Sequence, residues 1–127
     1  MAVQLNHTIV SARDKQASAA FLAEILGVGA PVAWGPFLGV VVDNGVTLDF
    51  IDSDGEITHQ HYAFLVSEDE FDKIFGRIQE RGLQYWADPG YTQPGEINTR
   101  DGGRGCYWDD PDGHVLEILT RPYGSGS

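Results

Sequence analysis

One acidic residue occupies a position where its charge needs an explanation. Glu117 lies in the middle of the aliphatic run VLEIL (115–119), which follows the turn signal PDG (111–113). The run predicts a buried strand, and an unpaired carboxylate inside a protein is costly. We therefore expect a compensating group, and a divalent cation held by Glu117 together with nitrogen ligands would provide one.

The chain repeats one pattern of segments, which indicates an internal duplication. Two segments read glycine, two residues, leucine and an acid: GVTLDFI (45–51) and GHVLEIL (113–119). Two strand-like segments, LNHTIV (5–10) and HYAFLV (61–66), each hold a histidine near the start and precede a helical pattern. We therefore expect a strand, a helix and about three further strands, used twice.

Both helical patterns carry start and stop signals. Ser67 and Glu70 form a capping box for the second helix, which Gly82 ends, whereas Asp14 and Gly27 bound a looser first helix. Each helix has one apolar stripe: Phe21, Leu22, Ile25 and Leu26 in the first, and Phe71, Ile74, Phe75 and Ile78 in the second. The further strands are expected at about 32–34, 37–43, 46–52, 83–87, 103–109 and 114–120.

These elements predict a single α+β domain over residues 1–121. Its two repeat units cover about 1–54 and 55–121, and residues 122–127 are expected to be a flexible tail. The segment 88–102 is an unusually long connection that is rich in proline and glycine. Such loops are often functional.

Composition excludes several classes of partner. The chain has 8 basic and 19 acidic residues and a net charge of −11, which argues against nucleic-acid binding and favours cationic or neutral partners. No apolar run approaches the roughly 18 residues that would indicate a membrane span. With one cysteine, Cys106, and no secretory signal, we expect a cytoplasmic protein without an intrachain disulfide.

The repeat places four potential metal ligands on equivalent strands. His7 and His61 lie on the first strand of each unit, and Asp49 and Glu117 lie on the last, so the four side chains can converge if the units pack by a pseudo-twofold axis. Strand alternation points His61 and Glu117 away from the helix. Two histidines and one carboxylate form the open site of non-haem Fe(II) enzymes. Asp49 is either a further ligand, a residue next to the ligands or a solvent-facing acid, and His59 is an alternative ligand on the face of His61.

These residues resemble a known family. The repeated βαβββ unit, LNHTIV, HYAFLV and DPDGHVLEI resemble the vicinal oxygen chelate superfamily over residues 4–121. That group includes glyoxalase I, extradiol dioxygenases, fosfomycin-resistance thiol transferases and bleomycin-binding proteins. The resemblance implies a cupped, open mixed sheet with a divalent metal in the cup, and a homodimer whose cups are shared between subunits. The implied ligands are His7, His61 and Glu117, and Asp49 takes the place of a glutamate ligand in glyoxalase I, one methylene shorter.

The leading hypothesis is a metal-dependent enzyme of the glyoxalase or dioxygenase type. Two vicinal oxygens of a small substrate would bind the metal, which acts as a Lewis acid. Fe(II) would favour ring cleavage or hydroxylation, whereas Ni²⁺, Zn²⁺ or Mn²⁺ would favour isomerase or lyase chemistry. Glu117 or Asp49 could detach and act as a base, and Tyr107 matches a substrate-contacting tyrosine of the fosfomycin-resistance group. The residues expected around the substrate are Trp34, Phe37, Tyr107, Trp108 and Arg104.

Other members of the superfamily fit less well. Ile9 stands where the fosfomycin-resistance enzymes have a threonine, and we find neither their lysine in QYWADPG (84–90) nor their arginine after the last strand. We therefore do not expect that activity. The alternative is a binding protein of the bleomycin-resistance type, which sequesters a natural product without a metal; the net charge agrees with it, but the retained His, His and Glu do not.

Overall fold

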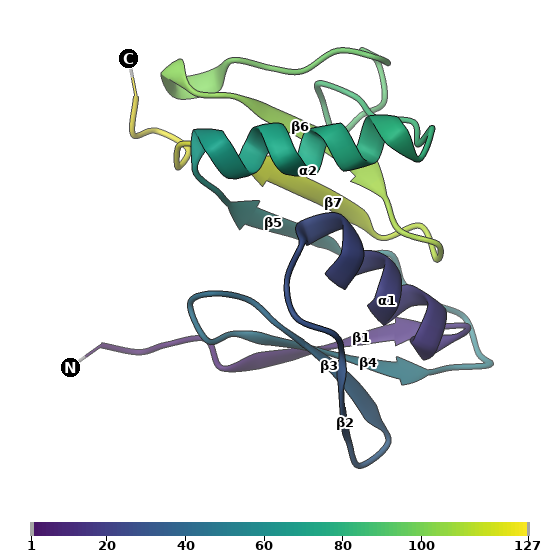
Figure 1. Ribbon diagram of the computed structural model, residues 1–127. Coiled ribbons are helices and arrows are strands. Elements are labelled where there is room, and N and C mark those ends of the chain that lie inside the picture. Colours follow the sequence, from purple (N-terminus) through teal and green to yellow (C-terminus); the bar gives the residue numbers. More distant parts are fainter. Residues whose placement is uncertain (1, 127) are drawn as a thin grey trace. The chain divides into compact units, whose positions relative to one another are not determined.

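The computed structural model describes residues 2–126 of the chain. The chain divides into two compact units, with the boundary between Thr58 and His59. Each unit has one α-helix and one small β-sheet, so the predicted α+β class is confirmed (Figure 1). Within residues 2–126, no helix is long and apolar enough to cross a membrane.

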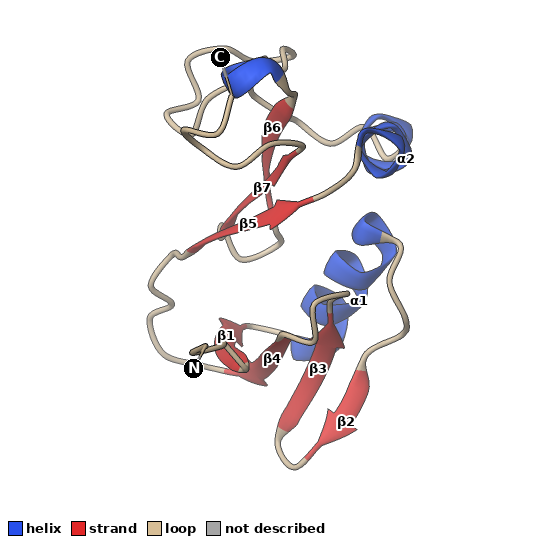
Figure 2. Ribbon diagram, turned by 90° about the vertical axis from the view of Figure 1, so that its left-hand side faces the viewer, coloured by secondary structure: helices blue, strands red, loops and turns tan. Residues whose placement is uncertain are grey.

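The first unit follows the predicted order of one strand, one helix and three strands. Its elements are β1 (His7–Ala12), α1 (Lys15–Leu26), β2 (Val32–Trp34), β3 (Phe37–Val41) and β4 (Thr47–Asp52). The sheet order is β1-β4-β3-β2, with β1 parallel to β4 and the other pairs antiparallel. Helix α1 lies against β1, β3 and β4 and covers one face of this sheet (Figure 2).

The signals predicted for α1 are the ones that bound it. The Asp14 carboxylate accepts hydrogen bonds from the backbone N–H groups of Gln16 and Ala17, at 3.0 and 3.3 Å. Gly27 has a φ of 73°, a left-handed conformation that ends the helix and returns its N–H to the carbonyl of Ala23. The buried face of the helix is made by Ser18, Ala19, Leu22, Ala23, Ile25 and Leu26, whereas Phe21 is only partly buried.

The second unit follows the same order of strand, helix and strands as the first. The strand expected at 83–87 is reduced to an isolated bridge at Trp86. Its elements are β5 (His61–Leu65), α2 (Glu68–Glu80), the 3₁₀ turn η1 (Arg100–Gly102), β6 (Gly105–Asp109) and β7 (Val115–Leu119). The sheet order is β5-β7-β6, so β7 is the central strand, parallel to β5 and antiparallel to β6.

Helix α2 begins as predicted, and three of the four residues of its predicted stripe are buried, whereas Phe75 is only partly buried. The Ser67 hydroxyl accepts a hydrogen bond from the N–H of Glu70 at 3.1 Å, and three acidic residues in the first turn complement the helix dipole. Phe71, Ile74 and Ile78 form the buried stripe of the helix. These residues bury the apolar side of α2 and leave its charged side in water.

The strand predicted at 83–87 is much shorter in the structure. Only Trp86 pairs there: its N–H and carbonyl each bond to Tyr107 at 2.9 Å. Directly afterwards, the Asp88 carboxylate accepts N–H bonds from Thr92 and Gln93, at 3.0 and 2.9 Å. This side-chain bonding turns the chain, so the segment cannot continue along β6.

The parallel pairs bring the first and last strands of each unit side by side. Ile9 of β1 is the partner of Asp49 in β4, and Ala63 of β5 is the partner of Glu117 in β7. The two acids, each at the middle of its strand, therefore lie one strand away from the histidines that begin β1 and β5. This pairing positions the candidate ligands of each unit.

Candidate metal and substrate site

Glu117 lies on the central strand of the second sheet, and its side chain is 1% exposed. One of its oxygens, Oε1, is 2.9 Å from Nε2 of His61. The imidazole of His61 is 45% exposed and can be reached from solvent. The contact confirms that His61 and Glu117 share one face of their sheet, as strand alternation predicted.

The other oxygen of Glu117 is engaged by a residue that the sequence analysis missed. The Tyr123 hydroxyl donates a short hydrogen bond to Oε2 of Glu117. The hydroxyl of Tyr107 lies 2.7 Å from that of Tyr123, and Nη1 of Arg100 donates to both hydroxyls, at 2.6 Å for Tyr107 and 3.4 Å for Tyr123. A cluster of Arg100, Tyr107, Tyr123, Glu117 and His61 is thus formed within one unit.

The surroundings of Tyr123 in this cluster keep its hydroxyl protonated. Partial burial, and then the hydrogen bond to Glu117, raise the pKa of Tyr123 well above its ordinary value. Tyr123 is therefore a neutral phenol that donates a hydrogen bond to the carboxylate of Glu117. The guanidinium of Arg100 also lies over the rings of Tyr107 and Tyr123, at 5.6 and 6.0 Å from their centres.

The donor atoms of the second unit fit a divalent transition metal. Two ligands that are each about 2.1 Å from one cation, at right angles to each other, are about 3 Å apart. The separation of 2.9 Å between His61 Nε2 and Glu117 Oε1 agrees with that geometry. An imidazole nitrogen beside a buried carboxylate is also the ligand chemistry that zinc and iron accept.

His7, the third predicted ligand, lies in the first unit. Its Nδ1 is 2.7 Å from Oδ1 of Asn6, an oxygen that can only accept a hydrogen bond. The proton of a neutral His7 ring is therefore on Nδ1, and Nε2 keeps the lone pair that a metal would need. The ligation of a metal by His7 stays a prediction.

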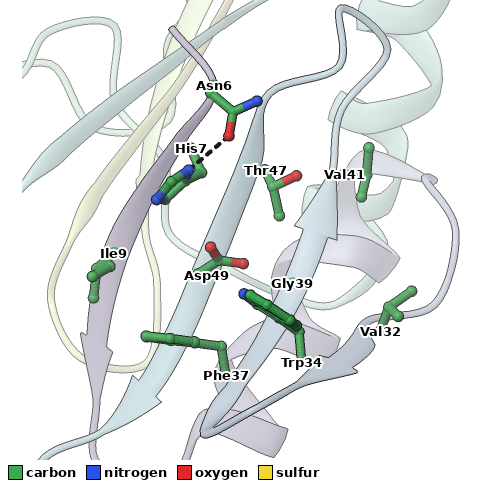
Figure 3. A pocket seen from close by; sticks show the side chains of 10 residues that line it. All are labelled: Asn6, His7, Ile9, Val32, Trp34, Phe37, Gly39, Val41, Thr47 and Asp49. Atoms are coloured by element: carbon green, nitrogen blue, oxygen red, sulfur yellow. Dashed lines mark hydrogen bonds between the residues drawn. The ribbon is translucent and has the colours of Figure 1, made fainter.

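A pocket of about 590 Å³ lies on the same unit, over strands β1 to β4 (Figure 3). It contains Trp34 and Phe37, which the sequence analysis expected beside the substrate. Its lining residues are Asn6, His7, Ile9, Val32, Trp34, Phe37, Gly39, Val41, Thr47 and Asp49. The walls are mainly apolar and aromatic, which is usual for small-molecule sites.

Asp49 supplies the carboxylate of this pocket and is only 5% exposed. Its partner on β3 is Gly39. A Cβ atom at Gly39 would lie 2.9 Å from Cγ2 of Thr47 and 3.0 Å from Oδ1 of Asp49. The absence of a side chain at Gly39 is therefore what leaves space beside the carboxylate.

No three side chains of His, Cys, Asp or Glu form a metal-binding group among the residues that the structure describes. His7 and Asp49 belong to the first unit, and His61 and Glu117 belong to the second. The predicted four-residue set thus consists of two pairs, and the pair of His61 and Glu117 is in direct contact. His59, the alternative ligand, packs edge-on against the ring of His114, with centroids 6.4 Å apart.

Two residues that were expected beside the substrate have other roles in the structure. The Arg104 guanidinium makes ion pairs with Glu68 at 2.7 Å and with Asp72 at 2.9 Å, so it ties α2 to the start of β6. Trp108 is fully buried and pairs with Leu116, on the face of the sheet opposite to Glu117. The predicted role of Arg104 and Trp108 beside the substrate stays a prediction: in this structure the Arg104 guanidinium is engaged by carboxylates and Trp108 is part of the core.

Tyr107 shares the face of Glu117, as its register pairing requires. It is 1% exposed, and its hydroxyl is occupied by Arg100 and Tyr123. Its predicted catalytic and substrate-contacting role stays a prediction, and in this structure the hydroxyl serves the cluster around Glu117. Arg100 could have been suspected because it lies in the long segment 88–102, whereas Tyr123 lies in the residues expected to be a tail.

The comparisons with known proteins agree with this fold. Residues 4–118 match the Glyoxalase/Bleomycin resistance protein/Dioxygenase superfamily, and the chain belongs to this family. Glutathione transferase FosA from Serratia marcescens is 30% identical over 125 residues, which cover 93% of this chain and 81% of that protein.

Two solved structures are much more similar. Oxidase ChaP-H2 is 68% identical, with a TM-score of 0.97 and complete coverage of both chains. Oxidase ChaP-H1 is also 68% identical, with a TM-score of 0.95 and coverage of 97% of this chain and 99% of that one. The predicted α+β fold, with one helix and one small mixed sheet in each unit, is thus shared with these two solved structures.

Proposed function

We propose that this protein is a metal-dependent oxidase that acts on a small, oxygen-rich aromatic molecule. The observation that carries the proposal is the contact between His61 and the buried Glu117, two donors at a separation that suits one cation. The identity of 68% with two proteins named oxidases supports oxidation as the reaction. The 30% identity with a glutathione transferase is a weaker argument for group transfer, and Ile9 departs from the pattern of the fosfomycin-resistance enzymes.

The proposed metal ligands are His61 and Glu117, with His7 as the third. Glu117 would neutralise part of the charge of the cation, while the half-exposed His61 ring lies beside a side open to solvent. When bound, an iron ion would supply Lewis acidity and the activation of O₂, the oxidant that this reaction needs. Manganese, nickel and zinc are compatible with the same ligands.

The proposed substrate pocket is the one lined by Trp34, Phe37 and Asp49. The two aromatic rings would bind a flat ring system by stacking and by burial of apolar surface. Asp49 is a largely buried carboxylate in the lining of this mainly apolar pocket, and it would accept a hydrogen bond, and then a proton, from a substrate hydroxyl. A hydroxylated aromatic compound satisfies both parts of the pocket.

The second candidate is a metal-free protein that binds a natural product. The name of the family, which includes bleomycin resistance proteins, suggests it. The net charge of −11 favours it, because it would attract a cationic compound. The contact of His61 with Glu117 favours the oxidase, since a binding protein has no need of a buried carboxylate beside an imidazole. A homodimer in the cytoplasm completes the proposal.

Metal content tests the proposal directly. The unaltered chain, purified without a metal-binding tag, is expected to hold about one transition-metal ion per chain. His61→Ala and Glu117→Gln should lose the metal, because each removes a ligand. His59→Ala is the matched control and should keep it, since His59 packs against His114. Consumption of O₂ with a panel of hydroxylated aromatic compounds should require the metal-loaded protein.

A different pattern would contradict the oxidase. Metal-free protein that binds a cationic natural product in equimolar amount would establish the second candidate. Metal retained in both His61→Ala and Glu117→Gln would place any metal site elsewhere.

A further inference from the structure

The hydrogen-bonded cluster around Glu117 has a direction that can be worked out from its chemistry. We propose that Tyr123, supported by Tyr107 and Arg100, is a positioning residue that leaves only one oxygen of Glu117 to a metal. The inference rests on the proposed function, because it concerns how the proposed ligand is presented. It assigns a role to two residues, Arg100 and Tyr123, that are not themselves ligands.

Each hydrogen bond of the cluster has a single possible donor. The Tyr123 hydroxyl is the donor and Oε2 of Glu117 the acceptor, so the single hydroxyl proton of Tyr123 points at Oε2. Tyr123 then accepts from Tyr107, whose own oxygen accepts from Arg100, a group that can only donate. All the donors therefore point toward Glu117, from the guanidinium through two phenols to the carboxylate.

The two carboxylate oxygens of Glu117 consequently have different environments. Oε2 is occupied by Tyr123, whereas Oε1 faces Nε2 of His61 at 2.9 Å. A metal that takes the imidazole would meet Oε1 and would bind the carboxylate through one oxygen. Aligned hydrogen bonds polarise one another. The charge of Arg100 therefore strengthens the hydrogen bond from Tyr123 to the carboxylate of Glu117.

Local contacts hold Tyr123 in this place. The segment after β7 turns on itself, because the N–H of Ser125 bonds to the carbonyl of Pro122 at 3.1 Å and Arg121 donates to the carbonyl of Ser125 at 3.2 Å. The N–H of Gly126 reaches Asp101, the neighbour of Arg100, at 3.4 Å. Two hydrogen bonds thus join the segment after β7 to the loop that carries Arg100: this one, and the bond from Arg100 to the Tyr123 hydroxyl.

The test compares two substitutions that each remove one phenol hydroxyl. Tyr123→Phe deletes the bond to Glu117. Tyr91→Phe is the matched control, because the Tyr91 hydroxyl bonds to the carboxylate of Asp109 at 2.8 Å in the same unit. The measurement is the dissociation constant of Zn²⁺ from the full chain, in competition with a coloured chelator. Loss of a hydrogen-bond partner of a metal ligand weakens binding by about 10-fold or more. We expect this loss for Tyr123→Phe and none for Tyr91→Phe.

Two further measurements separate positioning from a general loss of structure. Thermal unfolding of the metal-free chains should be the same for both tyrosine variants. With Co²⁺ in the site, the ligand-field absorption should change in Tyr123→Phe, because Oε2 becomes free to bind the metal, and should not change in Tyr91→Phe. Arg100→Met removes the charge but keeps an apolar stem. It should also raise the dissociation constant of Zn²⁺, by less than Tyr123→Phe does.

The outcomes distinguish this inference from the proposed function. If the unaltered chain binds Zn²⁺ through His61 and Tyr123→Phe binds it equally or more tightly, the positioning role is refuted and the metal site stands. Equal weakening in Tyr91→Phe also refutes it. If the unaltered chain binds no metal at all, both the proposed function and this inference are overturned.

Discussion

At the residue scale, Gly39 keeps the space beside the Asp49 carboxylate. Its position on β3 is directly opposite Asp49 in the register of the sheet. Any larger residue would bring a Cβ atom closer to the carboxylate oxygen and to the Thr47 methyl group than ordinary van der Waals contact allows. The action of Asp49 on a pocket ligand that we propose therefore depends on a glycine at position 39.

Gly39→Ala tests this arrangement. The added Cβ would lie 2.9 Å from Thr47 and 3.0 Å from Asp49, so the strand or the side chains must shift. Overpacking of this kind lowers the free energy of unfolding by about 1–3 kcal/mol. Turnover of substrate should fall as well, because the methyl group fills the space beside Asp49. Urea unfolding and O₂ consumption would measure the two effects.

The control for that substitution is Gly29→Ala in the same unit. An added Cβ at Gly29 meets no atom within 4 Å, so both stability and turnover should be retained. Equal behaviour of the two alanine variants would show that Gly39 does not control access to Asp49.

Residue types and spacing were enough to predict that Glu117 and His61 share one face of a sheet, because an acid inside an aliphatic strand and a repeated pattern are both visible in one sequence. They could not find Tyr123 or Arg100. The contacts of these two depend on how a loop and the segment after β7 fold back, and no periodicity encodes that path. The ion pairs of Arg104 were not predicted for a related reason: the acids that bind it, Glu68 and Asp72, are more than 30 positions away in the sequence.

At the element scale, a lysine at the start of α1 supports the turn between β2 and β3. The ammonium of Lys15 donates to the carbonyl of Pro36 at 2.7 Å, and the backbone N–H of Lys15 donates to Asp52 at 2.8 Å. The turn carries Trp34 and Phe37 at its two ends, so the Lys15 side chain adds a hydrogen bond between α1 and the aromatic wall of the pocket to the packing of α1 on β3.

Lys15→Met should loosen that wall without removing the helix. The substitution keeps the apolar stem and deletes the donor to Pro36, which costs about 0.5–1.5 kcal/mol of stability. Backbone hydrogen exchange at residues 34–37 should become faster, and the KM of an aromatic substrate should rise.

The control is Lys73→Met, whose ammonium pairs with Glu70 at 3.6 Å on the exposed side of α2. Exposed pairs of this type contribute little, so exchange at residues 34–37 should be unchanged. Loosening of the turn in neither variant would mean that Pro36 needs no support from α1.

Element boundaries were largely predictable because caps and periodicity are local signals. Asp14, Gly27 and Ser67 bound the helices where the sequence placed them. The strand expected at 83–87 was the exception, since its length is decided by the side-chain bonds of Asp88 in the turn that follows. Alternation of apolar residues predicts which face of a strand is buried. It does not predict over how many residues the strand pairs with its neighbour.

At the scale of the whole molecule, the exposed apolar residues that line the pocket indicate association with a second chain. Four apolar side chains of the first unit that line the pocket are 49–68% exposed: Ile9, Val32, Trp34 and Val41. The edge strand β2 also leaves backbone groups open on one side of the sheet. Exposed apolar groups beside an open sheet edge are typical of surfaces that another chain covers.

We therefore expect sedimentation velocity to give a dimer, at twice the chain mass of 13.9 kDa. Trp34→Arg should lower the dimer fraction, because it places a charge among the exposed apolar groups. Arg121→Glu serves as a charge-changing control on the second unit. A monomer at micromolar concentration would contradict this expectation.

The parallel pairing of β1 with β4, and of β5 with β7, also governs how the chain reaches its native state. His7 must find Thr47, and His61 must find Val115, across intervening stretches of 39 and 53 residues (7 to 47, and 61 to 115). Closing such long loops costs entropy before any strand contact repays it, and topologies of this kind fold slowly. We therefore expect the contact between His61 and Glu117 to form late in folding, once the most distant segments of the second unit have met.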